Sequence, residues 1–409
     1  MAAAVFAAEA GAPVLLFEQN EKLGKKLYIT GKGRCNFTNG CGADQLSAGV
    51  VSNPKFLYSA FHGFDNRQAV SLFERLGVPV KMERGLRYFP QSDHSSDIIR
   101  ALERRLLELG AEVHLRTKVK SILFRSESSQ DGEKRSVRGI LLENGREIPG
   151  DCVILASGGL SYPATGASGD GYRMAADAGH RTEKQRPALV PLVTAEDYIT
   201  RMQGLSLRNV VLSVFDGKKK LFSEFGEMLF THFGISGPLA LSASSYIGKK
   251  LEQHPLPAEI DLKPALSIEQ LSARLLREFE AAGNKTFRNI LPALLPAKMV
   301  PVVTELSGIP GEKRAHDITR EDRERTAGIL KRFPMTITDV RGYNEAIITQ
   351  GGISVKEVNP ATMESKLAEG LYFAGEVLDL DAVTGGFNLQ IAWSTAHAAA
   401  CAAAKKCLS

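Results

Sequence analysis

The chain has 409 residues, of which 44% are apolar, so it is long enough for two or three globular domains with real cores. Its 51 basic and 46 acidic residues give a net charge of +5, which is compatible with RNA or another phosphate-bearing partner and does not require one. Five cysteines without a CxxC pair argue against a zinc ribbon and suit a reducing cytoplasm. No apolar run reaches the length of a membrane span, and we do not expect the apolar N-terminus to be a signal peptide, because it lacks a basic region and contains Glu9.

The chain opens with a pattern that is half of a dinucleotide-binding unit. Residues 2–10 predict a helix of small side chains, and residues 14–17 predict a buried strand that ends at Glu18. In a βαβ unit of this kind, an acidic residue at that position binds the adenosine ribose about 20 residues after the first glycine of the phosphate loop. A position about 20 residues before Glu18 would lie ahead of Met1, the first residue of this sequence. We therefore expect the first strand and glycine loop to be missing from a truncated chain; the alternative is that the βαβ interpretation is wrong.

The segment GKGRCN at residues 31–36 gathers two glycines, an arginine, a thiol and an amide. Arginine binds pyrophosphate in a bidentate manner, and the nearby Lys26 adds a point charge. Cys35 is either a redox thiol or, as we favour in the absence of a CxxC partner, a small buried side chain beside a cofactor. We expect Gly33, Arg34, Cys35 and Asn36 to contact that cofactor.

The rest of the first part alternates between helical and strand patterns. The expected helices cover residues 66–77, 96–110 and 169–179, and the expected strands cover residues 112–115, 119–124, 136–142 and 152–156. Val119 begins a strand where its backbone is placed to bind an adenine edge, although an ordinary buried valine fits the pattern better. The turn Ser157-Gly158-Gly159 is suited to pass beneath a dinucleotide. The glycine-rich loop at 161–171, which contains Tyr162, is expected to lie near the cofactor.

The sequence texture changes near residue 187. Residues 189–230 predict short strands with polar turns, residues 267–282, 286–295 and 320–333 predict helices, and residues 335–340 and 345–349 predict strands. In the motif THFGISGP at 231–238, a proline follows at the first turn of an expected helix. His232 is a candidate substrate-facing group, with a capping or core histidine as the more ordinary alternative.

The last part contains a strand, a diglycine and an alanine-rich helix. The segment GLYFAGEVLD covers residues 370–379, and GGFNLQ covers residues 385–390. A helix start supplies unpaired N–H groups to an electron-rich ligand, and two glycines let the backbone come close to it. The expected cofactor contacts in this part are Gly375, Glu376, Asp379, Gly385, Gly386, Asn388 and Leu389.

Taken together, GKGRCN, THFGISGP, NPATMES at 359–365 and the C-terminal run resemble one bacterial family. These are the FAD-dependent oxidoreductases known as aminoacetone oxidase-like or bile-acid enone reductase-like flavoproteins. The resemblance covers nearly the whole chain. It implies an α/β fold in which a glutathione-reductase-type FAD domain of Rossmann-like form is interrupted by a β-barrel-like and a helical segment. We expect the FAD domain at 1–186 and 350–409, and the insertion at 187–349 with its helical part near 266–333.

The function that the resemblance implies is reduction of an activated C=C bond, driven by NAD(P)H as a transient reductant. Uracil in ribosomal RNA and a small enone are the substrate classes, and Cys35, Tyr162 and His232 are the candidate catalytic residues. One alternative is a flavin amine oxidase that acts on a small aminoketone. Another is a nucleic-acid-binding homologue that has lost FAD. No metal is expected, and the sequence leaves the oligomeric state open.

Overall fold

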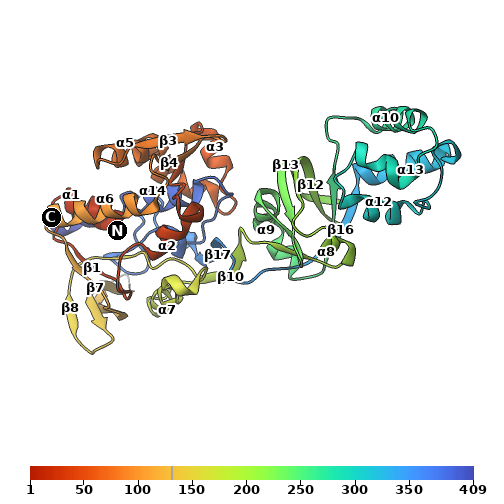
Figure 1. The fold of residues 1–409 in the computed structure, drawn as a ribbon. Helices are drawn as coiled ribbons and strands as arrows, with labels where there is room; N and C mark the ends of the chain where they lie inside the picture. The colour runs from red at the N-terminus through yellow and green to blue at the C-terminus, as the bar shows by residue number, and fades with distance from the viewer. Residues whose placement is uncertain (130–131) are drawn as a thin grey trace. The chain divides into compact units, whose positions relative to one another are not determined.

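A computed structural model describes residues 1–129 and 132–409, and it divides the chain into two compact units. The first unit contains Met1–Ala188 and Tyr343–Ser409, and the second contains Leu189–Gly342. The second unit is thus inserted between two segments of the first. Both termini belong to the first unit (Figure 1).

The first unit contains two pairs of parallel strands, as expected for a nucleotide-binding fold. Strand β1 (Leu15–Phe17) pairs with β5 (Glu112–His114), and β18 (Leu371–Phe373) pairs with β9 (Val153–Leu155). Antiparallel sheets flank these pairs. One consists of β2 (Thr38–Asn39), β4 (Arg87–Pro90) and β3 (Val80–Glu83); a second of β6 (Val119–Ser129), β7 (Gly132–Leu142) and β8 (Glu147–Pro149); a third of β10 (Thr182–Ala188) and β17 (Ile348–Ile353).

The helices of this unit surround its core. The α-helices are α1 (Ala2–Glu9), α2 (Lys25–Ile29), α3 (Ala43–Ala48), α4 (Tyr58–Gly63), α5 (Asn66–Arg75), α6 (Ser95–Glu108), α7 (Asp170–Asp177) and α14 (Phe387–Leu408). Because α1 and α14 are rich in alanine, they can pack closely, and they lie side by side in Figure 1. Helix α5 begins with a capping box between Asp65 and Gln68. The buried face of α14 joins the same core as β9 and β18.

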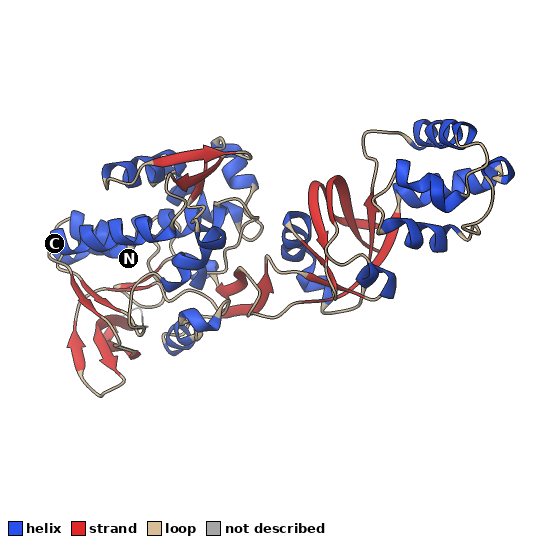
Figure 2. Cartoon of the chain, in the orientation of Figure 1, coloured by secondary structure: helices blue, strands red, loops and turns tan. Residues whose placement is uncertain are grey.

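The second unit has a closed barrel of six strands in the order β11, β14, β13, β12, β15 and β16. Its strands are drawn in red in Figure 2. The strands are β11 (Leu192–Thr194), β12 (Ser206–Asp216), β13 (Lys219–Phe230), β14 (Gly234–Ser236), β15 (Leu256–Asp261) and β16 (Phe333–Val340). Alternating side chains of β12 and β15 point into a buried apolar interior. Helix α9 (Pro238–Leu251) packs on the barrel and α8 (Asp197–Arg201) is short.

The remaining helices of this unit gather beside the barrel (Figure 2) and share its apolar core. They are α10 (Ile268–Ala281), α11 (Phe287–Ile290), α12 (Met299–Ser307) and α13 (Arg320–Lys331). The single helix expected at 286–295 is wrong. Pro292 has no N–H to continue the helix, so α11 ends and a 3₁₀ turn follows at Leu291–Ala293. The strand expected at 345–349 instead begins at Ile348 and extends to Ile353.

Candidate cofactor site

At the start of helix α14, the backbone of Gly386 lies very close to the backbone of Thr38. Its N-cap, Gly386, has φ +99°, and no side chain caps the helix. A Cβ atom at Gly386 would lie 2.4 Å from the carbonyl oxygen of Thr38, so no other residue fits without moving backbone. The first-turn N–H groups of this 22-residue helix therefore retain their capacity to bind an acceptor from outside the chain.

A set of hydrogen bonds joins this helix start to strand β2, far away in the sequence. The Asn39 side-chain amide donates to the Gly385 carbonyl at 2.9 Å and to the Gly85 carbonyl at 3.0 Å. The Thr38 hydroxyl donates to Gln390 Oε1 at 2.6 Å. These bonds are buried or partly buried, so they fix the diglycine against the segment that follows GKGRCN.

Asn388 and Leu389 support the helix start in different ways. The Asn388 side chain donates to the Ala382 carbonyl at 2.8 Å and accepts from the Ala382 N–H at 2.9 Å. The Asn388 side chain thus holds the loop before α14 in place, and the backbone N–H of Asn388 remains available to a ligand. Leu389 packs partly buried against the core of the first unit.

Glu376 anchors a second cluster, where the turn after β18 meets the loop after β9. One carboxylate oxygen accepts hydrogen bonds from the Ser161 hydroxyl at 2.9 Å and the Thr349 N–H at 2.8 Å. The other lies 3.2 Å from the Lys26 ammonium, which also donates to the Ser161 carbonyl at 3.1 Å. Lys26, predicted to bind pyrophosphate, thus has its charge balanced by a carboxylate. Gly375, with φ +74°, donates its N–H to the Thr395 hydroxyl at 3.0 Å.

The Ser157–Gly159 turn is packed against the same cluster. Gly158 has φ +75° and open space where a Cβ would be. At Gly159 a Cβ would lie 2.4 Å from the Thr349 hydroxyl and 2.7 Å from Glu376 Oε1. At Gly171, a Cβ would lie 2.0 Å from the Ser157 hydroxyl. Gly158 and Gly159 are therefore required for different reasons. Gly158 adopts a left-handed backbone conformation, whereas Gly159 leaves room for the side chains of Thr349 and Glu376.

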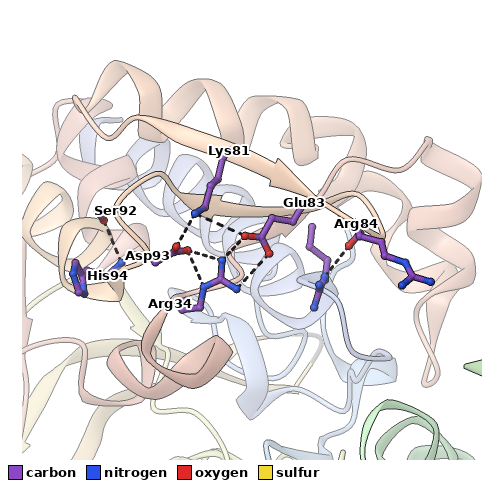
Figure 3. A network of polar contacts seen from close by, with 8 residues as sticks. Arg34, Lys81, Glu83, Arg84, Ser92, Asp93 and His94 are labelled. Atoms are coloured by element: carbon purple, nitrogen blue, oxygen red, sulfur yellow. Dashed lines mark hydrogen bonds and ion pairs between the residues drawn. The ribbon is translucent and has the colours of Figure 1, made fainter. Parts of the chain in front are cut away.

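Arg34 has partners that the sequence analysis did not foresee. Its guanidinium donates to Asp93 at 2.8 Å and to Glu83 at 3.3 Å, and it lies 4.2 Å from the centre of the Phe89 ring. Lys81 adds an ion pair to Asp93 at 2.6 Å, and Figure 3 shows both cations between the two carboxylates. Hydrogen bonds from Arg34 raise its own pKa and lower the pKa of Glu83. This network ties residues 31–36 to the β3–β4 hairpin.

Cys35 and Asn36, which follow Arg34 in the chain, are buried and half-buried, respectively. Cys35 is fully buried with φ +57°, and burial raises the pKa of its thiol to about 12. It is therefore a neutral thiol at physiological pH, as expected of a small buried side chain. The side-chain oxygen of Asn36 is buried and has no hydrogen-bond partner among the described residues. Gly33, with φ +85°, has open space around its Cβ position.

The remaining predicted contacts lie at strand ends and in loops of the first unit. Glu18 follows β1, and its carboxylate accepts hydrogen bonds from the N–H and side-chain amide of Asn20 at 2.8 and 2.7 Å. Val119 begins β6 and is partly buried opposite Leu142 of β7. The Asp379 carboxylate accepts a 2.8 Å hydrogen bond from Asn53.

The other two candidate catalytic residues lie in different units. Tyr162 precedes a 3₁₀ turn with φ +53°, and its N–H donates to the Tyr343 carbonyl at 2.9 Å. His232 lies in the second unit between β13 and β14. Its side chain is exposed, with its ring edge-on to Phe233 at 5.0 Å between centroids, so it is neither a core histidine nor the cap of α9.

Two residues of the site, Thr349 and Asn53, were not predicted, whereas Ser161 begins the loop at 161–171 that was expected to lie near the cofactor. Thr349 accepts hydrogen bonds from the Leu160 and Ser161 N–H groups at 2.8 and 3.1 Å while its own N–H binds Glu376. The sequence pattern around Thr349, a threonine at the end of an apolar run, does not predict these hydrogen bonds. The one available signal was the density of small and hydroxyl residues around Gly159.

The residues present fit an FAD molecule by the chemistry of their polar groups. An uncapped helix start and glycines without space for a Cβ are suited to a cofactor with electron-rich and phosphate groups. Buried polar atoms normally have partners, yet Asn36 Oδ1 and the Tyr172 hydroxyl have none among the described residues. Both lie in the unit that contains the helix start.

The comparison with protein families decides the assignment. Residues 1–402 match the family described as the HI0933-like protein Rossmann domain. The chain belongs to this family. This confirms the family resemblance, the Rossmann-type FAD-binding fold and the assignment of the chain to the FAD-dependent oxidoreductases. No helix in the described part of the chain is long and apolar enough to cross a membrane.

Curated relatives align over almost the full chain. The 3-dehydro-bile acid delta(4,6)-reductase of Clostridium scindens is 31% identical over 97% of this chain and 93% of the relative. The ribosomal RNA dihydrouridine synthase of Haemophilus influenzae is 33% identical over 96% of this chain and 93% of the relative. Among solved structures, 3-ketosteroid delta1-dehydrogenase from Sterolibacterium denitrificans covers 99% of this chain and 97% of its own, with a TM-score of 0.54 and 14% identity. That likeness shows the fold alone.

Proposed function

We propose that the protein uses FAD to reduce an activated C=C bond, with NAD(P)H as the electron source. The observation that carries this proposal is the start of α14, where Gly386 has no space for a Cβ beside Thr38 and the Gly385 carbonyl is held by Asn39. The names of the two relatives support the reaction class, because a delta(4,6)-reductase and a dihydrouridine synthase both saturate a conjugated double bond.

The chain's own residues bind and orient the cofactor, and bound FAD supplies the hydride chemistry. The first-turn N–H groups of α14, including those of Asn388 and Leu389, would face an electron-rich edge of the cofactor. The positive end of the helix would stabilise negative charge there. Asn36 would offer its unpartnered oxygen to a cofactor N–H, and Glu18 would hold the ribose.

The Lys26–Glu376 pair would support the turn that lies beneath the cofactor. Because the two charges balance, this cluster adds little net charge to the site. Cys35, whose pKa is raised to about 12 by burial, would serve as a neutral packing group. Tyr162 and His232 remain candidates for proton donation to the substrate.

The substrate is either a small conjugated ketone or a uracil in ribosomal RNA. The basic side chains of the helical segment give little support to RNA binding, since many are paired with carboxylates. The pairs include Arg288–Glu312, Lys313–Asp322, Arg320–Glu324 and Lys331–Asp261. Salt dependence separates the two classes, because phosphate contacts weaken steeply as salt rises.

The test is anaerobic oxidation of NADPH and of NADH by the FAD-loaded protein, followed at 340 nm with an unsaturated 3-keto steroid or a ribosomal RNA transcript. The proposal expects substrate-dependent oxidation and a product that gains two hydrogens by mass. In a separate assay in the presence of oxygen, oxidation of a small aminoketone without NAD(P)H, with O2 reduced to hydrogen peroxide, would instead establish an amine oxidase. A colourless protein that binds RNA and no FAD would overturn both enzyme assignments.

A further inference from the structure

Two cysteines meet where the last turn of α14 packs beside the start of strand β9. Cys152 directly precedes β9 and is half-buried, whereas Cys407 lies in the last turn of α14 and is exposed. The Cys152 Sγ lies 3.8 Å from the carbonyl oxygen of Ala403. In an α-helix the N–H of each residue bonds to the carbonyl four residues earlier, so the N–H of Cys407 faces that same oxygen. The two cysteines are therefore neighbours across the contact between helix and strand.

The two thiols are also in direct contact. Burial raises the pKa of the Cys152 thiol above its usual value, and a hydrogen bond with the Cys407 thiol raises that pKa further. Both sulfurs lie near the Tyr372 hydroxyl, whose pKa is raised by burial, by Glu364 and by the two cysteines. The carbonyl of Ala403, the bond between the thiols and their shared neighbour Tyr372 all place the two sulfurs together on one face of α14.

We propose that Cys152 and Cys407 form a redox-active pair that closes a reversible disulfide between β9 and α14 in the presence of hydrogen peroxide. Side chains whose sulfurs are already in contact need little backbone movement to form this bond. Cys407 reacts first, because it is exposed to a dissolved oxidant, whereas burial keeps Cys152 protonated.

The reaction has two steps that balance. The Cys407 thiolate attacks one peroxide oxygen, the O–O bond breaks, and the released hydroxide takes a proton to become water, which leaves a sulfenic acid on Cys407. The Cys152 sulfur then attacks the Cys407 sulfur, the S–O bond breaks, and the oxygen leaves as water with the Cys152 proton. The two thiols are oxidised by two electrons and peroxide is reduced to two waters. A dithiol reverses the bond and is itself oxidised to a disulfide.

The disulfide would link two elements that support the candidate cofactor site. Strand β9 leads into the turn of Gly158 and Gly159, and α14 begins directly after the diglycine. Because the bond would close a long loop of the chain, it would restrict the unfolded state and raise the thermal unfolding midpoint. Both sulfurs belong to the chain itself and the reaction needs no FAD. The inference therefore stands or falls separately from the proposed function.

The test treats the reduced, desalted protein with hydrogen peroxide, blocks the remaining thiols with iodoacetamide and maps tryptic peptides without a reductant. We expect a linked pair of peptides that contain Cys152 and Cys407, from a chain that migrates as a monomer on a non-reducing gel. The thermal unfolding midpoint should rise, and dithiothreitol should reverse both changes. Cys407→Ser, a substitution at an exposed position, should abolish the link and the rise together.

Cys401→Ser is the matched control. Cys401 is exposed on the same helix, and its sulfur lies 3.6 Å from Nε2 of His397. This variant should form the link and gain stability as the wild type does. Peroxide that adds oxygen to Cys407 while Cys152 stays free would overturn the inference, as would a disulfide that joins two chains. An equal rise of the midpoint in Cys407→Ser would also overturn it.

Discussion

The side-chain amide of Asn39 donates a 2.9 Å hydrogen bond to the carbonyl of Gly385, which lies 346 residues further along the chain. The same amide donates to Gly85, and the Asn39 side-chain oxygen accepts from the Cys41 N–H at 3.1 Å. One buried amide thus fixes the diglycine before α14 to strand β2 and to the β3–β4 hairpin. The candidate cofactor site depends on this junction between the two ends of the chain.

Replacement of this amide should therefore disturb both folding and FAD binding. We expect Asn39→Ala to lower the free energy of unfolding by about 2–3 kcal/mol, because two carbonyls and an N–H lose their buried partner. Urea unfolding and an FAD titration measure the two effects. The control is Asn144→Ala at an exposed turn, where the Asn144 side chain accepts a hydrogen bond from the Arg146 N–H; its effect should stay within about 0.5 kcal/mol. Equal stability of the two variants would contradict this account.

Gly386 should tolerate no side chain. Gly386→Ala places a Cβ 2.4 Å from the Thr38 carbonyl oxygen, so the start of α14 must move, at a cost above about 3 kcal/mol, and FAD binding should be lost. Gly145→Ala is the matched control, since Gly145 has a similar φ of +85° in open space. It should cost only about 1–2 kcal/mol, the strain of the left-handed conformation. FAD retention by Gly386→Ala would show that the close contact is unimportant.

The chain's local patterns could be predicted from sequence, whereas its long-range contacts could not. The helices at 66–77 and 96–110 follow from apolar spacing, and the diglycine before α14 stands out because two consecutive glycines let the backbone come close to a ligand. The partners of Arg34 are different. Glu83 and Asp93 are more than 45 residues away, and only the folded β3–β4 hairpin brings them together. A guanidinium in a glycine-rich segment equally suits pyrophosphate, so the sequence offered no means of choosing.

The Lys26–Glu376 pair should be coupled more strongly than an ordinary surface pair. Both side chains are less than one-third exposed, and Glu376 is held by Ser161 and Thr349. A double-mutant cycle with Lys26→Met and Glu376→Gln should give a coupling energy of about 1 kcal/mol. The comparison pair is Lys25–Glu21, an i,i+4 pair with a more exposed carboxylate, where we expect about 0.3–0.5 kcal/mol. A coupling energy near zero would show that the Lys26–Glu376 ion pair contributes no more to stability than two independent side chains.

Cys35 should make stability fall at alkaline pH. Its thiol pKa rises from 9.0 to about 12 on folding, so the unfolded chain loses this proton first as the pH rises. The stabilisation is complete below pH 9 and is lost between pH 9 and about 12, at about 1.4 kcal/mol per pH unit. Urea unfolding from pH 8 to 11 should show this slope as the difference between wild type and Cys35→Ala. If the free energies of unfolding of wild type and Cys35→Ala changed with pH in the same way, the Cys35 thiol would be accessible to water in the folded state.

The most direct test of the central claim is the visible absorption spectrum of the purified protein after incubation with FAD and desalting. The account predicts retained flavin bands at close to one FAD per chain, together with a higher thermal unfolding midpoint than that of the apoprotein. A folded protein that stays colourless, with the same midpoint whether or not FAD is added, would contradict the assignment of the α14 start and its glycines to FAD.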